Sequence, residues 1–117
     1  MKINEIVYKG KVLEFNTELG LIHFLAEELK TDSLREIIDY FSDVDGKDGV
    51  KISSLPRLSK LVRGAILIGS KEDIPEKDLD KWVLPNMLSV RKILMAFYKN
   101  MPGNGESDQA EGNVPAL

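Results

Sequence analysis

Acidic residues between positions 43 and 54 have the spacing that comes closest to a metal site. The stretch IIDYFSDVDGKDGVKISSL reads as helix, loop and helix, the layout that presents carboxylates to calcium in an EF-hand. Counted from Asp43, Asp45 falls at position 3, but Lys47 falls at position 5, Asp48 replaces the glycine at position 6, and Ser54 replaces the bidentate glutamate at position 12. A cation among the ligands and a missing glutamate both weaken binding. We therefore expect a solvated turn and keep a calcium-responsive module with an EF-hand-like loop 43–54 as an alternative, in which Asp43, Asp45 and Asp48 bind a cation weakly.

His23 is the only histidine, and it is therefore the only candidate for a histidine base or ligand. It borders the apolar side of a predicted helix, with Glu27 one turn further on. A catalytic histidine needs a nucleophile and an orienting partner, and the surrounding sequence supplies neither. We expect no enzyme, no cofactor and no metal. A hydrolase, which requires His23 to meet a serine or an aspartate in space, is the remaining catalytic alternative.

Basic residues near the C-terminal end could be fitted to a helix-turn-helix around Pro85. The helix that would enter DNA offers only Arg91, Lys92 and Lys99, whereas a DNA reader normally carries a basic stripe. The net charge also argues against DNA binding, because the residues before Gly103 carry 16 basic and 16 acidic groups. A neutral body exerts no long-range attraction on phosphate or anionic lipid. DNA binding is the weakest alternative, and we expect neither nucleic acid nor membrane as a partner.

The composition indicates a cytoplasmic protein. The chain of 117 residues has no cysteine, which removes disulfides and thiolate metal sites together. Its first residues carry charges every few positions and resemble no signal peptide. The longest uncharged apolar run, Ala65 to Ile68, is far too short to span a bilayer.

Hydrophobic periodicity predicts a mainly α fold of about five helices with an N-terminal β-hairpin at 3–15. The hairpin turns at Lys9-Gly10, where glycine permits a positive φ. The predicted helices start at Asn16 or Thr17, at Ser33, at Ser53 or Ser54, at Pro75 and at Asn86. Residues 1–102 should form a single helical domain, and residues 103–117, with Glu106, Asp108 and Glu111, a flexible acidic tail.

The third helix should lie at the centre of the domain, because its apolar residues wrap most of its circumference. Within it, Gly64 is expected to let a neighbouring backbone approach, and Gly69 to end the helix. Leu79, Trp82 and Val83 should face the core from the fourth helix. The fifth helix should do the same with Met87, Val90, Ile93, Leu94, Phe97 and Met101.

The order of these elements resembles the small tail assembly chaperones of long-tailed bacteriophages and gene transfer agents. The family phrase GK-x-x-x-F-x-x-x-L-G before the first helix is matched by Gly10, Lys11, Phe15, Leu19 and Gly20. A second phrase in the central helix is matched by Leu58, Leu61, Val62, Ala65, Leu67 and Gly69. The resemblance covers residues 3–101. The Asp-rich loop and the Trp82-Val83-Leu84-Pro85 corner depart from it.

The resemblance implies a non-catalytic cytoplasmic helper of the bacterial host cell that binds the tape-measure protein and helps to recruit tail-tube subunits. In that family a longer form often arises by ribosomal frameshift. An amphipathic partner helix would lie in a groove lined by apolar residues off the main core stripe. The candidates are Phe24, Leu84 and Met95. The same residues could instead complete the core or a contact between two copies, so a homo-oligomer stays open.

Overall fold

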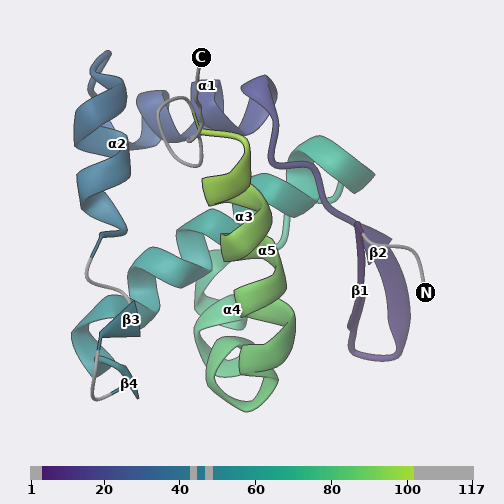
Figure 1. Cartoon of the computed structure of the whole chain (residues 1–117). Helices are drawn as coiled ribbons and strands as arrows, with labels where there is room; N and C mark the ends of the chain where they lie inside the picture. The colour runs from purple at the N-terminus through teal and green to yellow at the C-terminus, as the bar shows by residue number, and fades with distance from the viewer. Residues whose placement is uncertain (1–3, 43–44, 47–48, 102–117) are drawn as a thin grey trace, which may run out of the picture.

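Helices dominate the fold, and a short antiparallel hairpin precedes them (Figure 1). The computed structural model describes residues 4–42, 45–46 and 49–101. In order, the elements are β1 (Glu5–Tyr8), β2 (Lys11–Glu14), α1 (Leu19–Leu29), α2 (Leu34–Tyr40), β3 (Asp45–Gly46), β4 (Gly49–Val50), the 3₁₀ turn η1 (Ile52–Ser54), α3 (Leu55–Ser70), α4 (Glu76–Val83), the 3₁₀ turn η2 (Leu84–Asn86) and α5 (Met87–Lys99). The prediction of a mainly helical small domain with an N-terminal hairpin is confirmed. The predicted tail 103–117 lies outside the described residues, and the domain boundary at 102 stays a prediction.

The hairpin turns where the sequence predicts, at Lys9-Gly10. Both residues have positive φ, 50° and 80°, which is the conformation of the two-residue turns that join twisted strands. The register pairs Tyr8 with Lys11 and Ile6 with Leu13. Ile6 and Leu13 are buried, so this side of the ribbon faces the core.

The starts of the first two helices follow different rules. The N-cap of α1 is Glu18, one or two residues later than predicted, because the side chain of Asn16 accepts a hydrogen bond from the backbone N–H of Glu18 and forms a turn of its own. The next helix starts as expected. Ser33 is the N-cap of α2, and its hydroxyl accepts from the N–H of Glu36 at 3.3 Å.

α3 is the central helix, as predicted. It runs diagonally through the molecule, and α5 crosses it (Figure 1). α1, α4, α5 and β2 all pack against it. Its fully buried apolar residues are Leu58, Leu61, Val62, Ala65 and Ile66. Burial on most of its circumference explains why its sequence has no wide polar face.

The last two helices bury the residues that the periodicity predicts. Leu79, Trp82 and Val83 of α4 are buried, and so are five of the six residues predicted to face inward from the fifth helix: Val90, Ile93, Leu94, Phe97 and Met101. The sixth, Met87, is half-buried. Asn86 is the N-cap of α5, but its amide donates to the carbonyl of Trp82 at 2.8 Å and so holds the corner between the two helices.

Two glycines of α3 let neighbouring elements come close, each in a different way from the prediction. A Cβ on Gly64 would lie 2.5 Å from the ring of Phe24 and 2.8 Å from Leu21, so Gly64 accommodates side chains of α1 rather than a backbone. The prediction that Gly69 ends the helix is wrong, because α3 continues to Ser70 and the left-handed cap is Lys71. A Cβ on Gly69 would lie 2.6 Å from the carbonyl oxygen of Glu14.

Gly69 therefore lies where the main chain after β2 passes over α3. The backbone N–H of Asn16 donates to the carbonyl of Ala65 at 2.9 Å. The hydroxyl of Ser70 donates to the carbonyl of Glu14 at 2.7 Å and accepts from its N–H at 2.8 Å. Three hydrogen bonds thus fix the hairpin and the start of α1 on the last turns of α3.

We predict that Gly69→Ala destabilises the protein by about 1–3 kcal/mol, because the added methyl group meets backbone atoms that cannot rotate away. Urea unfolding followed by circular dichroism measures the change. Gly20→Ala is the matched control. Its Cβ would meet only the side chain of Ile68, whose nearest atom, Cγ2, would lie at 3.1 Å. Because a side chain can shift where a backbone cannot, and alanine is favoured over glycine in a helix, this variant should lose much less stability than Gly69→Ala. Equal losses in the two variants would contradict this account.

Candidate protein-interaction surface

The segment predicted as a calcium-loop alternative contains a very short hairpin. Asp45 pairs with Val50 and Gly46 with Gly49. Asp43 and Asp48 lie outside the described residues, so weak cation binding stays a prediction. Among residues 4–42, 45–46 and 49–101, the structure brings together no group of three histidine or acidic side chains that could hold a metal ion.

His23 lies exposed on α1 and lines none of the three pockets described below. The hydrolase alternative requires a cleft around this imidazole, so these pockets give it no support. The helix-turn-helix alternative meets a different difficulty. Lys92, one of its three basic residues, donates from Nζ to the carbonyl of Glu5 at 2.8 Å and so helps to hold the hairpin against α5.

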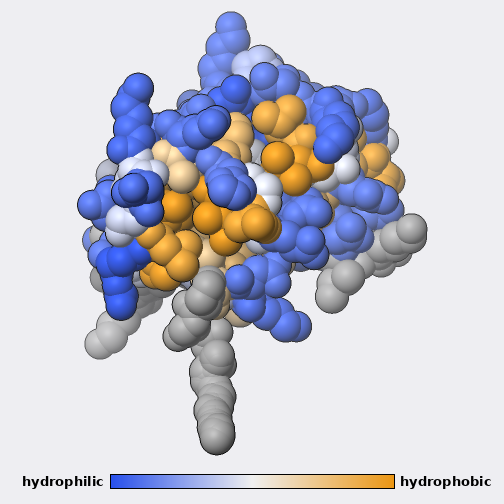
Figure 2. Space-filling model, turned by 90° about the horizontal axis from the view of Figure 1, so that it is seen from above, coloured by the Kyte–Doolittle hydropathy of each residue, from blue (hydrophilic) through white to orange (hydrophobic). Residues whose placement is uncertain are grey.

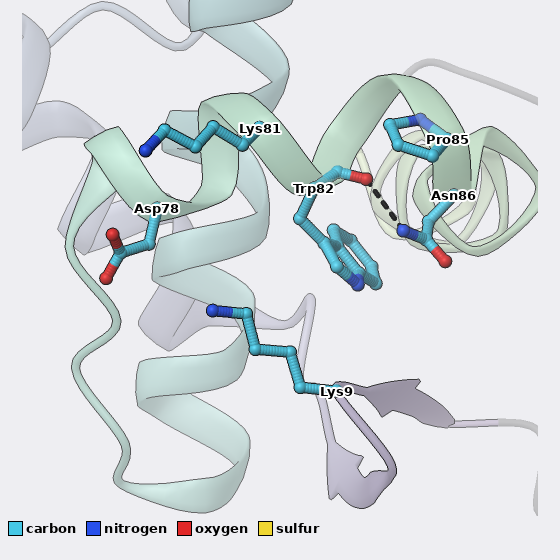
Figure 3. Close-up of a pocket in the computed structure, with 6 residues that line it drawn as sticks. All are labelled: Lys9, Asp78, Lys81, Trp82, Pro85 and Asn86. Carbon is cyan, nitrogen blue, oxygen red and sulfur yellow. Dashed lines mark hydrogen bonds between the residues drawn. The ribbon is translucent and has the colours of Figure 1, made fainter.

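A pocket of about 400 Å³ lies between the hairpin turn and the corner that joins α4 to α5 (Figure 3). Trp82 forms its apolar wall and packs against Tyr8, with ring centroids 5.5 Å apart and ring planes tilted by 56°. Lys9 reaches across from the turn towards α4, and Asp78 and Lys81 lie along that helix (Figure 3). These groups offer charge and an aromatic surface, but no nucleophile paired with a base.

Two further pockets have similar volumes. One, of about 320 Å³, lies between the start of α1 and the end of α5 and includes Thr17, Glu18 and Lys99. The other, of about 340 Å³, is lined by Arg63, Asp73, Pro75 and Glu76. The first of them contains the hydroxyl of Thr17 and the carboxylate of Glu18, but Thr17 is buried and its Oγ1 accepts a hydrogen bond from the amide of Asn100 at 2.9 Å, which is a packing contact between the start of α1 and the end of α5.

Phe24, the first predicted contact residue, packs against the fold. Its ring lies over Gly64, and the guanidinium of Arg63 is 5.5 Å from the ring centroid. The side chain is half-buried. Its contacts therefore resemble those of a packing residue between α1 and α3, with one edge left open to solvent.

Leu84 and Met95, the other two predicted contact residues, are exposed. Leu84 at the α4–α5 corner is 63 % exposed, and Met95 on α5 is 67 % exposed. Between them lies Leu88, which is 88 % exposed. Leu88 and Met95 are seven residues apart and share one side of α5, with Arg91 exposed between them. We call Leu88, Arg91, Met95 and Lys99 the α5 face.

Sequence reasoning missed Leu88, although its spacing contained the signal. Positions 84, 88, 91 and 95 follow the intervals of four and three residues that mark one side of a helix. The core stripe of α5 uses other positions, Val90, Ile93, Leu94 and Phe97. A second, narrower stripe opposite a complete core stripe indicates a surface available to a partner.

α1 carries a second apolar surface. Seen from above, hydrophobic side chains reach the surface among charged ones on the side of the molecule where α1 lies (Figure 2). On α1, Leu19 is 64 % exposed, whereas Ile22, Ala26 and Leu29 are half-buried and packed against the core. Because only one of these side chains is largely free, the α5 face offers the greater uncovered apolar surface.

An ionic cluster ties α1, α3 and α4 together. Lys60 contacts Glu28 and Glu76, both at 3.2 Å, and Arg63 contacts Asp73 at 2.8 Å and Glu76 at 3.3 Å. The hydrogen bond from Arg63 lowers the pKa of Asp73. Partial burial works against the charge of Lys60, but its hydrogen bonds to Glu28 and Glu76 outweigh this and raise its pKa. The cluster is structural, because all of its charges are paired with one another.

Comparison with known proteins adds no assignment. No family model matches the chain, and the searches of curated proteins and of solved structures return no significant match. In the part of the chain that the structure describes, no helix is both long and apolar enough to cross a bilayer.

We predict that Phe24→Ala lowers the free energy of unfolding by about 2 kcal/mol, because it leaves a void over Gly64. Met95→Ala should change it by less than about 0.5 kcal/mol, as an exposed substitution normally does. Chemical denaturation of both variants measures the difference. A Phe24→Ala protein as stable as the parent would show that the ring contributes nothing to the packing of α1.

The ionic cluster predicts how stability depends on pH. Because the folded state lowers the pKa of Asp73, its contribution is present above the ordinary value of 3.8 and is lost as the pH falls through the lower folded value. The contribution of Lys60 is present below 10.5 and is lost as the pH rises through its higher folded value.

Asp73→Asn should therefore flatten the fall in stability between about pH 5 and pH 2, as measured by urea unfolding at a series of pH values. Asp32→Asn, at an exposed carboxylate outside the cluster, is the control. If Asp73→Asn leaves the fall in stability at acid pH unchanged, the proposed contribution of Asp73 is contradicted.

Proposed function

We propose that this protein is a non-catalytic tail assembly chaperone that binds helical segments of a phage or prophage tape-measure protein. The observation that carries the proposal is the α5 face, with Leu84 beside it at the α4–α5 corner. Leu84, Leu88 and Met95 are exposed on the surface, while a separate stripe of α5 fills the core. Such an arrangement suits the capture of another protein better than it suits chemistry.

The binding mode would be that of an amphipathic helix laid along α5. Burying a leucine or methionine side chain contributes about 1.5–3 kcal/mol. The free energy gained by burying a few such side chains, reduced by the entropy cost of association, gives a modest affinity. A modest affinity suits a chaperone that must later release its partner. Met95 suits such a surface because its flexible thioether adapts to different partners.

The residues that carry the family resemblance support the proposal by lying together. A Cβ on Gly69 would lie 2.7 Å from Cα of Phe15, and a Cβ on Gly20 would lie 3.1 Å from the side chain of Ile68. The two family phrases therefore contribute to one junction, between the start of α1 and the end of α3. The proposed setting is the bacterial cytoplasm, and tail-tube subunits are the second proposed partner.

The proposal predicts that the protein co-purifies with the tape-measure protein encoded beside it when the two are co-expressed. Leu88→Ser and Met95→Ser should each reduce the amount recovered about tenfold, because each removes one apolar anchor. Pull-down followed by quantification of both chains measures this.

Leu19→Ser is the matched control, since it removes an exposed leucine from α1, and recovery should be unchanged. The variants should unfold at the same denaturant concentration as the parent, because all three side chains are exposed. Failure of the parent chain to retain any neighbouring tape-measure protein would refute the proposed function.

A further inference from the structure

The pocket between the hairpin turn and the α4–α5 corner contains a buried donor that lacks an acceptor. Trp82 is only 7 % exposed. Its backbone carbonyl accepts from the amide of Asn86 at 2.8 Å, but its indole N–H donates to no group in the described part of the chain. The ring hangs from α4 towards the hairpin, with its nitrogen at the edge that faces the space between Lys9 and Asn86 (Figure 3). Burying an unsatisfied N–H costs free energy, and an oxygen acceptor bound in the pocket would recover it.

Two lysine side chains bring positive charge to the same pocket. Lys9 extends from the hairpin turn, and Lys81 lies beside Trp82 on α4. The Nζ of Lys9 is 5.5 Å from the centroid of the Tyr8 ring, a contact that leaves its charge in place. Neither lysine forms an ion pair within residues 4–42, 45–46 and 49–101. Both are therefore able to attract an anionic ligand.

Asp78 is the acidic side chain of the pocket. It lies on α4 one turn before Trp82, and its carboxylate is on the far side of Lys9 from the indole ring in Figure 3. The two lysines and this aspartate leave the pocket with a net positive charge. An anion beside the indole N–H is thus favoured by the lysines and opposed, from a greater distance, by Asp78.

The residue types at this pocket are not explained by the fold or by the proposed chaperone function. Lys9 has a φ of 50°, a conformation that asparagine, aspartate and glycine adopt more readily, so the turn gains nothing from a lysine. What this lysine adds is an ammonium group at the pocket. The Trp82-Val83-Leu84-Pro85 corner is also the part of the chain that departs from the family resemblance.

We propose that this pocket binds a carboxylate ligand that carries an aromatic or apolar group. The carboxylate accepts from the indole N–H of Trp82 and lies beside the ammonium group of Lys9, which makes the interaction charge-assisted. The apolar part of the ligand lies against Trp82 and Pro85. A volume of about 400 Å³ suits a small molecule or one residue of a peptide. The site uses no residue of the α5 face, so it goes beyond the proposed function and does not rest on it.

The single tryptophan makes binding observable in the full chain. In a proton–nitrogen correlation NMR spectrum it gives one indole N–H resonance, which should move downfield as an oxygen acceptor binds. Phenylpropionate is the probe, and phenylpropionamide, which has the same shape without the charge, is its matched control. We expect a saturable shift with phenylpropionate, about tenfold tighter than with the amide and weakened by salt. Acetate, which lacks the ring, should also bind about tenfold more weakly.

Variants locate the ligand in the pocket. Lys9→Asn should stabilise the turn and yet weaken the binding of phenylpropionate about fivefold, a combination that a purely structural role would not give. Asp78→Asn should tighten binding about twofold, because it removes a repulsive charge. Lys77→Gln, which removes the same charge from α4 outside the pocket, should leave the affinity unchanged.

A further variant isolates the indole donor. Trp82→Phe keeps an aromatic ring without the N–H and should weaken binding about fivefold, as read from the ligand's own resonances. Its denaturation midpoint, compared with that of the parent, establishes that the variant is folded. Undiminished binding to a folded Trp82→Phe protein would overturn the inference.

Other results would overturn it as well. Equal affinity for the acid and the amide would identify a purely apolar pocket, and binding of neither would show that water alone satisfies the indole N–H. An equal loss from Lys9→Asn and Lys77→Gln would identify general charge attraction. An indole resonance that moves upfield in the parent chain when Glu106, Asp108 and Glu111 are neutralised would assign the pocket to the chain's own carboxylates.

The source of the carboxylate is decided by two short peptides. One ends in phenylalanine with a free carboxylate, and the other has the same sequence with an amidated end. Binding of the first peptide alone, as tightly as phenylpropionate, supports a peptide C-terminus as the ligand. Binding of phenylpropionate without either peptide supports a free organic acid. Retention of a tape-measure protein is a separate measurement, and its failure would leave this inference unaffected.

Discussion

The passage of the main chain across Gly69 is the contact on which the rest of the structure depends. There the backbone N–H of Asn16 reaches the carbonyl of Ala65, and Ser70 holds both polar groups of Glu14. Because a glycine separates these partners, helix and chain approach more closely than any side chain would permit. This contact fixes the hairpin and the start of α1 on α3, the central helix against which α4 and α5 also pack.

Local patterns predicted most of the elements. The positive φ values of Lys9 and Gly10 follow from the turn that a two-residue hairpin demands. The N-cap of Ser33 follows from the capping spacing, and the burial of Leu79 and Trp82 follows from helical periodicity. In each case the cause lies within a few residues of its effect, which is why sequence alone reveals it.

Contacts between distant residues account for what was missed. Gly69 reads as a helix stop, but α3 continues for one more residue, and the close approach of Glu14, which is distant in the sequence, is what leaves no room for a side chain at this position. Asn16 reads as a helix cap, yet its backbone bonds to Ala65 and its side chain forms a local turn. Leu88 is a different case, because periodicity already predicted the core side of α5, and the exposure of the opposite side follows from the same pattern.

The hairpin's dependence on α3 has a consequence for the order in which the chain is made. Glu14 and its partner Ser70 are 56 residues apart, so on a ribosome the hairpin is synthesised well before the helix that receives it. At about 5–20 residues per second, that interval lasts roughly 3 to 11 seconds. During this time Ile6 and Leu13 have no core to cover them. The nascent chain therefore passes through a stage in which it exposes apolar surface of its own.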